Sequence, residues 1–407
     1  MKQRDPYDPL RIEAIYGGMQ GIYWAGACAM TAFTAVYLGW QGFSDAQIGY
    51  TASLIYFATI TLSLALSSFS DKHPQLPLRR LMTTLFLIAF FAAAVLHFVK
   101  LPILLMVAAY TLGCCTDNCL GSLTSALMMQ YLNGGIPVRY GWPRGVGSIV
   151  YAIVAFVLGI LMDTYSPGVL MPVFLLMDVL AICVLWCMPK PPQPKAPPRR
   201  ENGEKDSYFA MLRRNPTLVL LLLACIISGM GSCPVSTYRI RLVERLGGSA
   251  SQMGLMVFLD AGIELPMMIL SARLLRKVKV ETLLCVSFLA SAIKVLLLNL
   301  AGSMTVLYLA TLMNFFSFGI YGFASVLFAN AIVAPNEAVR SQSLLSLCYT
   351  SGLGGILGNL LSGALIDRMG LTNLLFLDFG LCVVGAAIML WCRNTYQRQK
   401  QKETAAG

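Results

Sequence analysis

Charged residues are scarce in this chain of 407 residues. Asp, Glu, Lys and Arg together make up 12% of it, well below the roughly 25% that is usual for soluble domains. The hydrophobic fraction is 57%, and the mean hydropathy is +0.69. This composition excludes a soluble enzyme and predicts an integral membrane protein. Ten-residue segments of alternating polarity are also absent, which excludes an outer-membrane barrel.

The residues needed for metal binding or catalysis are few as well. The chain has only two histidines, His73 and His97, and its twelve cysteines lie in apolar stretches, so we expect packing roles for the cysteines and no metal or other cofactor. No ATP-binding motif points to a primary pump. His97 has no nucleophile and base around it, and no soluble output domain follows the helices. We therefore expect neither an enzyme nor a sensor.

Long apolar runs are what the sequence does contain. Residues 14–44, 46–70 and 81–99 carry no charged side chain, and each run is long enough for the ~20 residues of a membrane-spanning helix. Polar breaks divide the chain into twelve predicted helices, with starts near residues 12, 45, 81, 102, 140, 168, 216, 249, 281, 303, 339 and 371. No cleavable signal is expected, because the first apolar run is longer than that of a signal peptide.

A proline-rich, charged segment separates two sets of six helices. We predict an N-terminal six-helix bundle at 1–188, a cytoplasmic linker at 189–214, a C-terminal six-helix bundle at 215–394 and a tail at 395–407. Most of the 30 Lys and Arg fall in the termini, the linker and alternate loops, which predicts that both termini are cytoplasmic in a multi-pass protein of the inner membrane. This distribution explains the net charge of +11 without a nucleic-acid partner.

The two halves repeat short motifs at corresponding places. SDAQIGY (44–50) at the start of the second helix recurs as SASQMGL (249–255) at the start of the eighth. GILMD (159–163) at the end of the fifth helix recurs as GALID (363–367) at the end of the eleventh. A parallel duplication explains both matches, and it predicts a substrate site near the membrane midplane between the halves.

Several motifs resemble one transporter family. Asp71-Lys72 with Arg79-Arg80 resembles the signature of the gating loop between helices 2 and 3 of the major facilitator superfamily. YGWPRGVGS (140–148), IELP (263–266), FSFGIYG (316–322) and RSQSLLSLCYTSGLGGILG (340–358) resemble the branch that holds lactose permease, nucleoside:proton symporters and phenylpropionate-permease-like transporters. The resemblance implies an all-α major facilitator fold, a monomer in membrane lipid, and alternating-access transport of a small molecule.

Acidic residues within the apolar runs are candidates for proton coupling. Glu264 and Asp260 are four residues apart on the predicted helix 8 and should share a face. An acid at membrane depth costs ~3 kcal/mol or more and usually marks a transport pathway, and repulsion between two carboxylates favours protonation of one. Asp117 on helix 4 is a third candidate. Structural pairing with a neighbouring cation is the alternative for each. The resemblance implies that Glu264, close before Pro266, also contacts substrate.

Basic, aromatic and amide side chains complete the predicted binding site. The resemblance implies that Arg144 contacts substrate and that Tyr151, two turns later, stacks against the substrate. The alternative for Arg144 is snorkelling to the cytoplasmic surface. Lys294 on helix 9 either faces a cavity or snorkels outward. Tyr16, Gln20, Tyr23 and Trp24 form one stripe of helix 1, which fits a wet cavity or aromatic packing. The predicted substrate-binding residues are Glu264, Arg144, Tyr151, Gln20, Trp24, Lys294 and Asn118.

These features favour a proton symporter of a small organic solute, with the cations favouring an anionic or aromatic carboxylate. Nucleoside or oligosaccharide symport and multidrug efflux are the alternatives, although helix 5 lacks the Gly-Pro motif of similar drug antiporters. Helix 10 also lacks the His and Glu through which lactose permease couples protons. Proton coupling would therefore have to use Glu264, Asp260 or Asp117.

Overall fold

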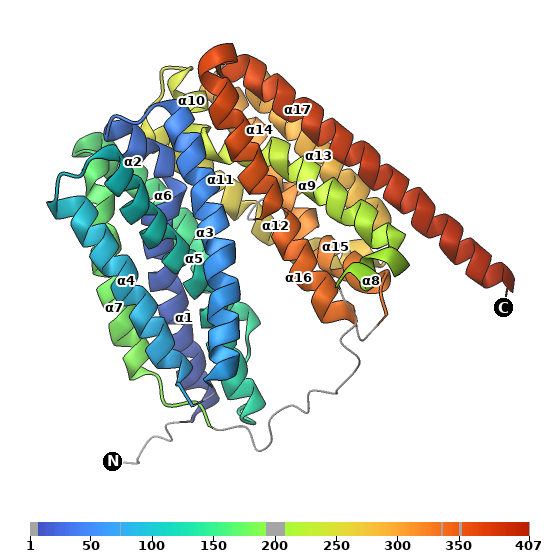
Figure 1. Ribbon diagram of the computed structural model, residues 1–407, viewed down its shortest axis with the longest axis horizontal. Coiled ribbons are helices and arrows are strands. Elements are labelled where there is room, and N and C mark those ends of the chain that lie inside the picture. The colour runs from blue at the N-terminus through green and yellow to red at the C-terminus, as the bar shows by residue number, and fades with distance from the viewer. Residues whose placement is uncertain (1–6, 74, 193–207, 335–336, 350–351, 407) are drawn as a thin grey trace. The chain divides into compact units, whose positions relative to one another are not determined.

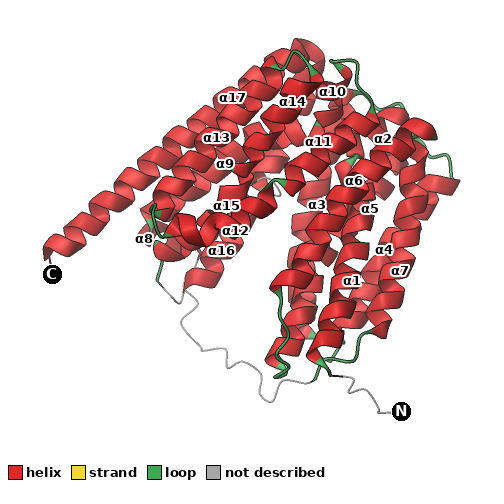
Figure 2. Cartoon of the chain, turned by 180° about the vertical axis from the view of Figure 1, so that it is seen from behind, coloured by secondary structure: helices red, strands yellow, loops and turns green. Residues whose placement is uncertain are grey.

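The computed structural model describes residues 7–73, 75–192, 208–334, 337–349 and 352–406. Within these ranges the chain is helical and has no strand (Figure 2). It divides into two compact units, each described by itself below. Unit 1 holds residues 1–43, 57–201 and 249–261, and unit 2 holds residues 44–56, 202–248 and 262–407. The predicted bundle limits of 1–188 and 215–394 differ from these units by two short segments and stay a prediction.

Unit 1 contains the helices of the N-terminal half and most of α11 (Figure 1). Its elements are α1 (Pro9–Ala27), a π-helix (Cys28–Ala32), α2 (Thr34–Trp40), the later part of α3 (Asp45–Lys72), α4 (Leu78–Phe98), α5 (Ile103–Asn133), α6 (Gly141–Thr164), a 3-10 turn (Pro167–Val169), α7 (Leu170–Cys187) and α11 (Ala250–Gly262). Its core is a set of buried aromatic and aliphatic side chains, among them Tyr16, Phe86 and Tyr131.

Unit 2 contains the helices of the C-terminal half and the start of α3. Its elements are α8 (Tyr208–Arg214), α9 (Pro216–Thr237), α10 (Arg239–Glu244), α12 (Glu264–Leu275), α13 (Val280–Leu300), α14 (Met304–Thr311), a 3-10 turn (Leu312–Phe315), α15 (Phe318–Ala331), α16 (Ala338–Cys348) and α17 (Leu353–Ala406). Phe288, Ile320 and Phe328 are buried at its centre.

The described helices include ten or eleven candidate membrane spans, against the twelve predicted. Ten stretches are long and apolar enough to cross a membrane, and the bent pair α1 and α2 supplies one more. The last of the ten contains most of α17, whose 54 residues would make about 80 Å of straight helix, longer than two bilayer cores. Gly370, at a φ of 74° that suits glycine, divides α17 where the sequence predicts the twelfth helix to start.

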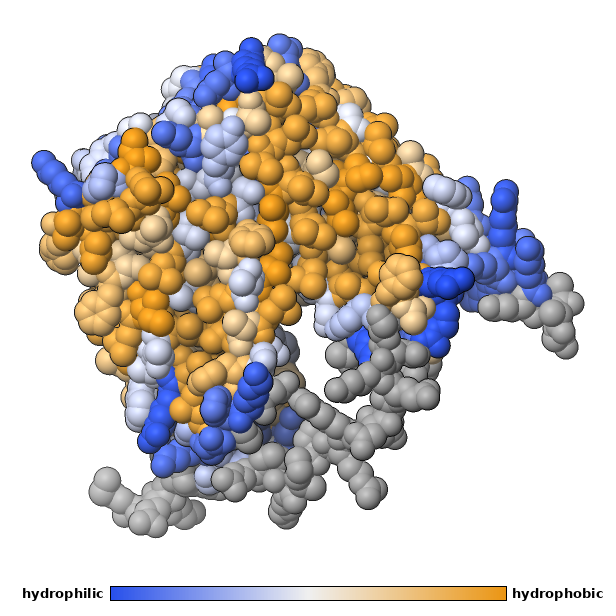
Figure 3. Space-filling model, in the orientation of Figure 1, coloured by the Kyte–Doolittle hydropathy of each residue, from blue (hydrophilic) through white to orange (hydrophobic). Residues whose placement is uncertain are grey.

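The surface of each unit has the character expected of a protein in lipid. Large apolar side chains such as Phe57, Phe91, Ile269 and Leu309 are more than half exposed. In the space-filling view, apolar side chains cover the flanks of the helices, and hydrophilic ones gather at helix ends and loops (Figure 3). Exposed apolar surface on this scale is unfavourable in water and favourable against acyl chains. The predicted all-α integral membrane fold is confirmed.

The repeated sequence motifs correspond to repeated helix starts. In unit 2, the Ser44 backbone N–H donates to Gln47 Oε1 at 3.0 Å, and the Gln47 N–H donates to Ser44 Oγ at 3.2 Å. In unit 1, the Ser249 N–H donates to Gln252 Oε1 at 2.8 Å. A Ser followed three residues later by Gln can satisfy helix-start N–H groups in this way, so the repeat has a local physical cause.

Two predicted helices carry local interruptions. Helix 8 loses one backbone hydrogen bond around Ile263, between α11 and α12, because Pro266 has no N–H to donate to the Gly262 carbonyl one turn earlier. Ile263 keeps helical φ and ψ of −72° and −14°, and residues Ala250–Leu275 still form one stretch long enough to span a membrane. Helix 10 is interrupted by the 3-10 turn and by Ser317, whose φ and ψ of −80° and −88° are not helical. That Asp260 and Glu264 share a face of helix 8 stays a prediction. Interrupted helices are where transporters often place binding groups.

Candidate functional site

A chain of hydrogen bonds runs along α1 in unit 1. The Trp24 indole Nε1 donates to Gln20 Oε1 at 3.0 Å, and Gln20 Nε2 donates to Tyr16 OH at 2.7 Å and to Thr124 Oγ1 of α5 at 3.1 Å. Gln20 is fully buried, so these bonds offset the cost of placing an amide in the interior. The spacing of four residues aligns the side chains on one helix face, as the stripe predicted.

The Arg144 guanidinium lies over the ring of Trp24, which belongs to this chain of hydrogen bonds. Its Cζ is 4.9 Å from the centroid of Trp24, within the range of a cation–π contact. Trp24 in turn meets Tyr151 edge to face at 5.9 Å. The guanidinium of Arg144 thus covers Trp24, and the expectation that Tyr151 stacks against a bound substrate stays a prediction. Gly147 makes this arrangement possible, because a β-carbon there would clash with the Trp24 ring. We call Gln20, Trp24, Arg144 and Tyr151 the Arg144 cluster.

A buried carboxylate that the sequence analysis missed fixes the start of α6. Glu13 is 1% exposed. Its oxygens accept hydrogen bonds from the Arg139 backbone N–H at 2.7 Å, from Arg139 Nη2 at 2.9 Å and from Trp142 Nε1 at 2.8 Å. Hydrogen bonds and charge from Glu13 raise the pKa of the Arg139 guanidinium above its ordinary value. Glu13 therefore joins α1 to the segment that leads into Arg144.

In unit 2, an amide links two opposite charges. Asn314 Nδ2 donates to Glu264 Oε1 at 2.8 Å, and Lys294 Nζ donates to Asn314 Oδ1 at 2.9 Å. Ser317 Oγ also donates to Asn314 Oδ1 at 3.2 Å. Glu264 begins α12 and Asn314 lies in the 3-10 turn, so both interrupted helices contribute. We call Glu264, Lys294, Asn314 and Ser317 the Glu264 cluster.

Lys294 makes a contact within unit 2 that bears on its predicted orientation. Its ammonium donates to Asn314, a bond that a lysine snorkelling outward would not make, and its cavity-facing role stays a prediction. Asn314 was not among the predicted site residues. The sequence marks Asn314 only as one of several polar residues in a membrane helix. Many asparagines at such positions have purely structural roles.

The remaining predicted acids have different surroundings. Asp117 is 1% exposed, and its Oδ2 accepts no hydrogen bond from any described residue. Tyr23 OH donates to the Asp117 backbone carbonyl at 2.9 Å. Asn118 Nδ2 donates to Thr59 Oγ1 of α3 at 3.4 Å, a helix-to-helix contact. Asp260 lies half-buried in the last turn of α11. A buried carboxylate with an unsatisfied oxygen is costly when ionised, which keeps Asp117 among the candidates for carrying a proton.

The predicted gating loop connects α3 and α4. Arg79 Nη1 donates to the Met188 carbonyl at 2.7 Å, and its Cζ lies 4.5 Å from the centroid of Trp186, so Arg79 attaches the start of α4 to the end of α7. Lys72 and Arg80 are exposed. The side chain of Asp71 lies outside the described part of the structure.

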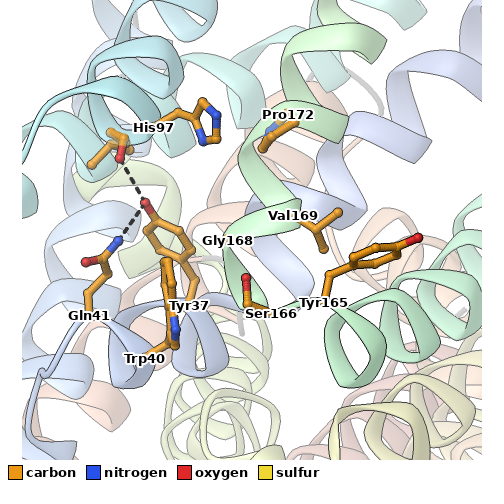
Figure 4. Close-up of a pocket in the computed structure, with 10 residues that line it drawn as sticks. Tyr37, Trp40, Gln41, His97, Tyr165, Ser166, Gly168, Val169 and Pro172 are labelled. Carbon is orange, nitrogen blue, oxygen red and sulfur yellow. Dashed lines mark hydrogen bonds between the residues drawn. The ribbon is translucent and has the colours of Figure 1, made fainter.

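Unit 1 also has a pocket of about 400 Å³ between α2, the end of α4 and the 3-10 turn before α7. Figure 4 shows Tyr37 OH donating to the Leu96 carbonyl at 3.3 Å and accepting from Gln41 Nε2 at 3.3 Å. None of the predicted site residues lines this pocket. Sequence patterns gave no sign of it, and it carries no part of the function proposed below.

An all-α membrane fold with hydrogen-bonded charges inside its apolar helices is typical of membrane transporters. Comparison with known proteins gives the family: residues 18–377 match the model of the MFS_1 like family, and the chain belongs to it. Its similarity to the maltose permease of Geobacillus stearothermophilus is 24% identity over 371 residues, which covers 89% of this chain and 90% of that protein.

Solved structures of three transporters are similar in fold. The nucleoside transporter NupG superposes with a TM-score of 0.76 at 14% identity, covering 94% of this chain and 98% of that one. The POT family transporter PepTSo gives 0.73 at 11% identity, over 96% and 99%. A bacterial homologue of the human lysosomal transporter Spinster, inward-facing and unoccupied, gives 0.72 at 14% identity, over 97% and 98%. The predicted major facilitator fold is confirmed, and these relatives are transporters rather than enzymes.

Proposed function

We propose that this protein is a proton symporter that brings a small organic solute across the cytoplasmic membrane by alternating access, with both termini in the cytoplasm. The observation that carries the proposal is the Glu264 cluster. A carboxylate, an amide and an ammonium joined within 3 Å are expensive inside membrane-spanning segments and are retained where they bind substrate or ions.

The charges of the clusters favour a substrate with a carboxylate. Lys294 offers an ammonium that already orients toward an amide oxygen, and Arg144 offers a planar guanidinium beside the Trp24 ring. An aromatic acid would match a cation with an adjacent ring. We propose that each cluster binds one part of the substrate during the cycle.

A hydroxylated substrate is the second candidate. The likeness to a maltose permease over 89% of the chain favours it, and so does the Gln20–Trp24 pair, because amide and indole groups suit sugar hydroxyls and a ring face. A thermal-shift screen of the purified protein against aromatic acids, nucleosides and oligosaccharides separates the candidates, since a ligand that binds only the folded state raises Tm. Stabilisation by maltodextrins and not by acids would reject the carboxylate.

Alternating access requires helix contacts that close one end of the transporter and separate when that end opens. In unit 1, Asp163 at the end of α6 accepts hydrogen bonds from the Ala250 and Ser251 backbone N–H groups at 3.0 and 2.9 Å. Gly159 and Gly254 let the two backbones touch there. In unit 2, Gly363 of α17 meets the Ala46 carbonyl of α3 in the corresponding way. We propose that these paired contacts close the outer end of the transporter.

The experiment compares accumulation with exchange. We expect Glu264→Gln to abolish substrate accumulation in liposomes under a proton gradient while counterflow, which needs no net proton movement, is retained. Glu281→Gln is the matched control, because Glu281 is another buried glutamate of unit 2 and bonds to Gln397 outside the cluster. Accumulation by Glu264→Gln at the unmutated rate would remove Glu264 from the coupling site. Uptake that follows a sodium gradient and ignores a proton gradient would reject proton coupling altogether.

A further inference from the structure

A groove on unit 2 differs from both clusters. It lies between α12, α13, the 3-10 turn and α15 and has a volume of about 650 Å³, within the roughly 300–1,000 Å³ of small-molecule sites. Met267, Leu283 and Ile320 form its buried floor, each at most 3% exposed. None of the residues of the Glu264 cluster lines it.

Two kinds of side chain line the groove. Most are apolar and include Leu270, Val286 and Phe316, each about 40% exposed. The others are Arg273, Arg276 and Lys277 at the C-terminal end of α12, and no acidic residue of the described part of the chain lines the groove. A ligand that fits must therefore be amphipathic, with an apolar chain and an anionic head.

The surface around the groove indicates whether this ligand comes from the membrane or from solution. Met268 and Ile269 of α12 are 64% and 79% exposed, and Leu289 of α13 is 55% exposed, so the two helices that form the groove also carry exposed apolar side chains, which suit contact with acyl chains. A soluble anion would be attracted by the cations and would gain nothing from the apolar walls. A zwitterionic lipid would fill the walls, but the cation of its headgroup would offset its phosphate and leave the three basic side chains without a net counter-charge. Basic pockets between membrane helices bind acidic lipid headgroups.

We propose that this groove binds an anionic phospholipid, with an acyl chain along Leu270, Val286 and Phe316 and the phosphate among Arg273, Arg276 and Lys277. Each basic residue near an anionic headgroup strengthens binding by about fivefold. Loss of all three should therefore weaken binding by on the order of 100-fold. The proposal concerns lipid alone and does not depend on which solute is transported.

The test uses the full-length protein in detergent with added phosphatidylglycerol or phosphatidylcholine. Thermal unfolding and native mass spectrometry should show that phosphatidylglycerol stabilises the protein and stays bound, and that phosphatidylcholine does neither. Combined Arg273→Gln, Arg276→Gln and Lys277→Gln should remove this preference. The control combines Arg398→Gln, Lys400→Gln and Lys402→Gln in α17, which removes the same charge away from the groove and should leave the preference intact.

A second variant tests the apolar walls of the groove independently of its basic residues. Val286→Trp fills the apolar part of the groove from an exposed position and keeps every cation, so it should also weaken phosphatidylglycerol binding without preventing folding. The proposal is overturned if either groove variant retains the full preference, or if the tail control loses it. It is also overturned if inorganic phosphate reproduces the stabilisation, because a free anion would then explain the cations.

Discussion

Gly159 of α6 and Gly254 of α11 lie at a close backbone contact in unit 1. A β-carbon added at Gly254 would lie 2.5 Å from the Ala155 carbonyl oxygen. The obstacle is backbone, which cannot rotate away as a side chain can, so α6 and α11 must separate. Such overpacking typically costs about 1–3 kcal/mol. Alanine also improves helix propensity by up to ~1 kcal/mol, but this gain is shared by every conformation in which α11 is helical.

Gly254→Ala should therefore shift the protein away from the conformation in which α6 touches α11. A difference of about 1–3 kcal/mol corresponds to a change of about 5- to 150-fold in that equilibrium. Ala155 is fully buried at the contact, so Ala155→Cys is a reporter. We expect a maleimide to label this cysteine in purified protein about 5- to 150-fold faster when Gly254→Ala is present.

The controls distinguish helix separation from unfolding. Gly18→Ala is the matched variant, because nothing lies within 4 Å of a β-carbon at that helical position, and it should leave labelling unchanged. Cys225 is fully buried in unit 2. Its maleimide labelling, measured on peptides from the same digested sample, reports global unfolding. The reasoning is refuted if Gly254→Ala labels no faster than Gly18→Ala, or if Cys225 is labelled in parallel.

Three further perturbations test other parts of the structure. Asn314→Leu should reduce uptake at least tenfold with little change in expression, because it breaks the link between Lys294 and Glu264; near-normal uptake would make the link dispensable. Glu13→Ala should lower Tm by at least the ~2–4 °C that about 1 kcal/mol produces in a unit of this size, and Glu13→Gln by less; equal melting curves would contradict this. Uptake should rise as external pH falls and collapse with a protonophore, and pH-independent uptake would argue against symport.

The sequence was most informative where structure depends on local patterns. Apolar run length identified the membrane helices, and the Ser44–Gln47 and Ser249–Gln252 motifs marked two helix starts because their hydrogen bonds span only three residues. Tertiary contacts were harder. Trp24 lies under the Arg144 guanidinium although it belongs to another helix, and no spacing in the sequence pairs these two residues. Glu13 and Arg139 are 126 residues apart, and no pattern in a single sequence pairs them.

Glu264 is the first residue of α12 and accepts a hydrogen bond from Asn314, while mutual repulsion between Asp260 and Glu264 stays a prediction. Asn314 both donates to the carboxylate and accepts from Lys294. If Glu264 takes up a proton, its neutral carbonyl oxygen still accepts from Asn314, so the lysine keeps its orientation. A change of charge at Glu264 then alters the field at Lys294 without dismantling the cluster, which is the property a coupled substrate and proton site requires.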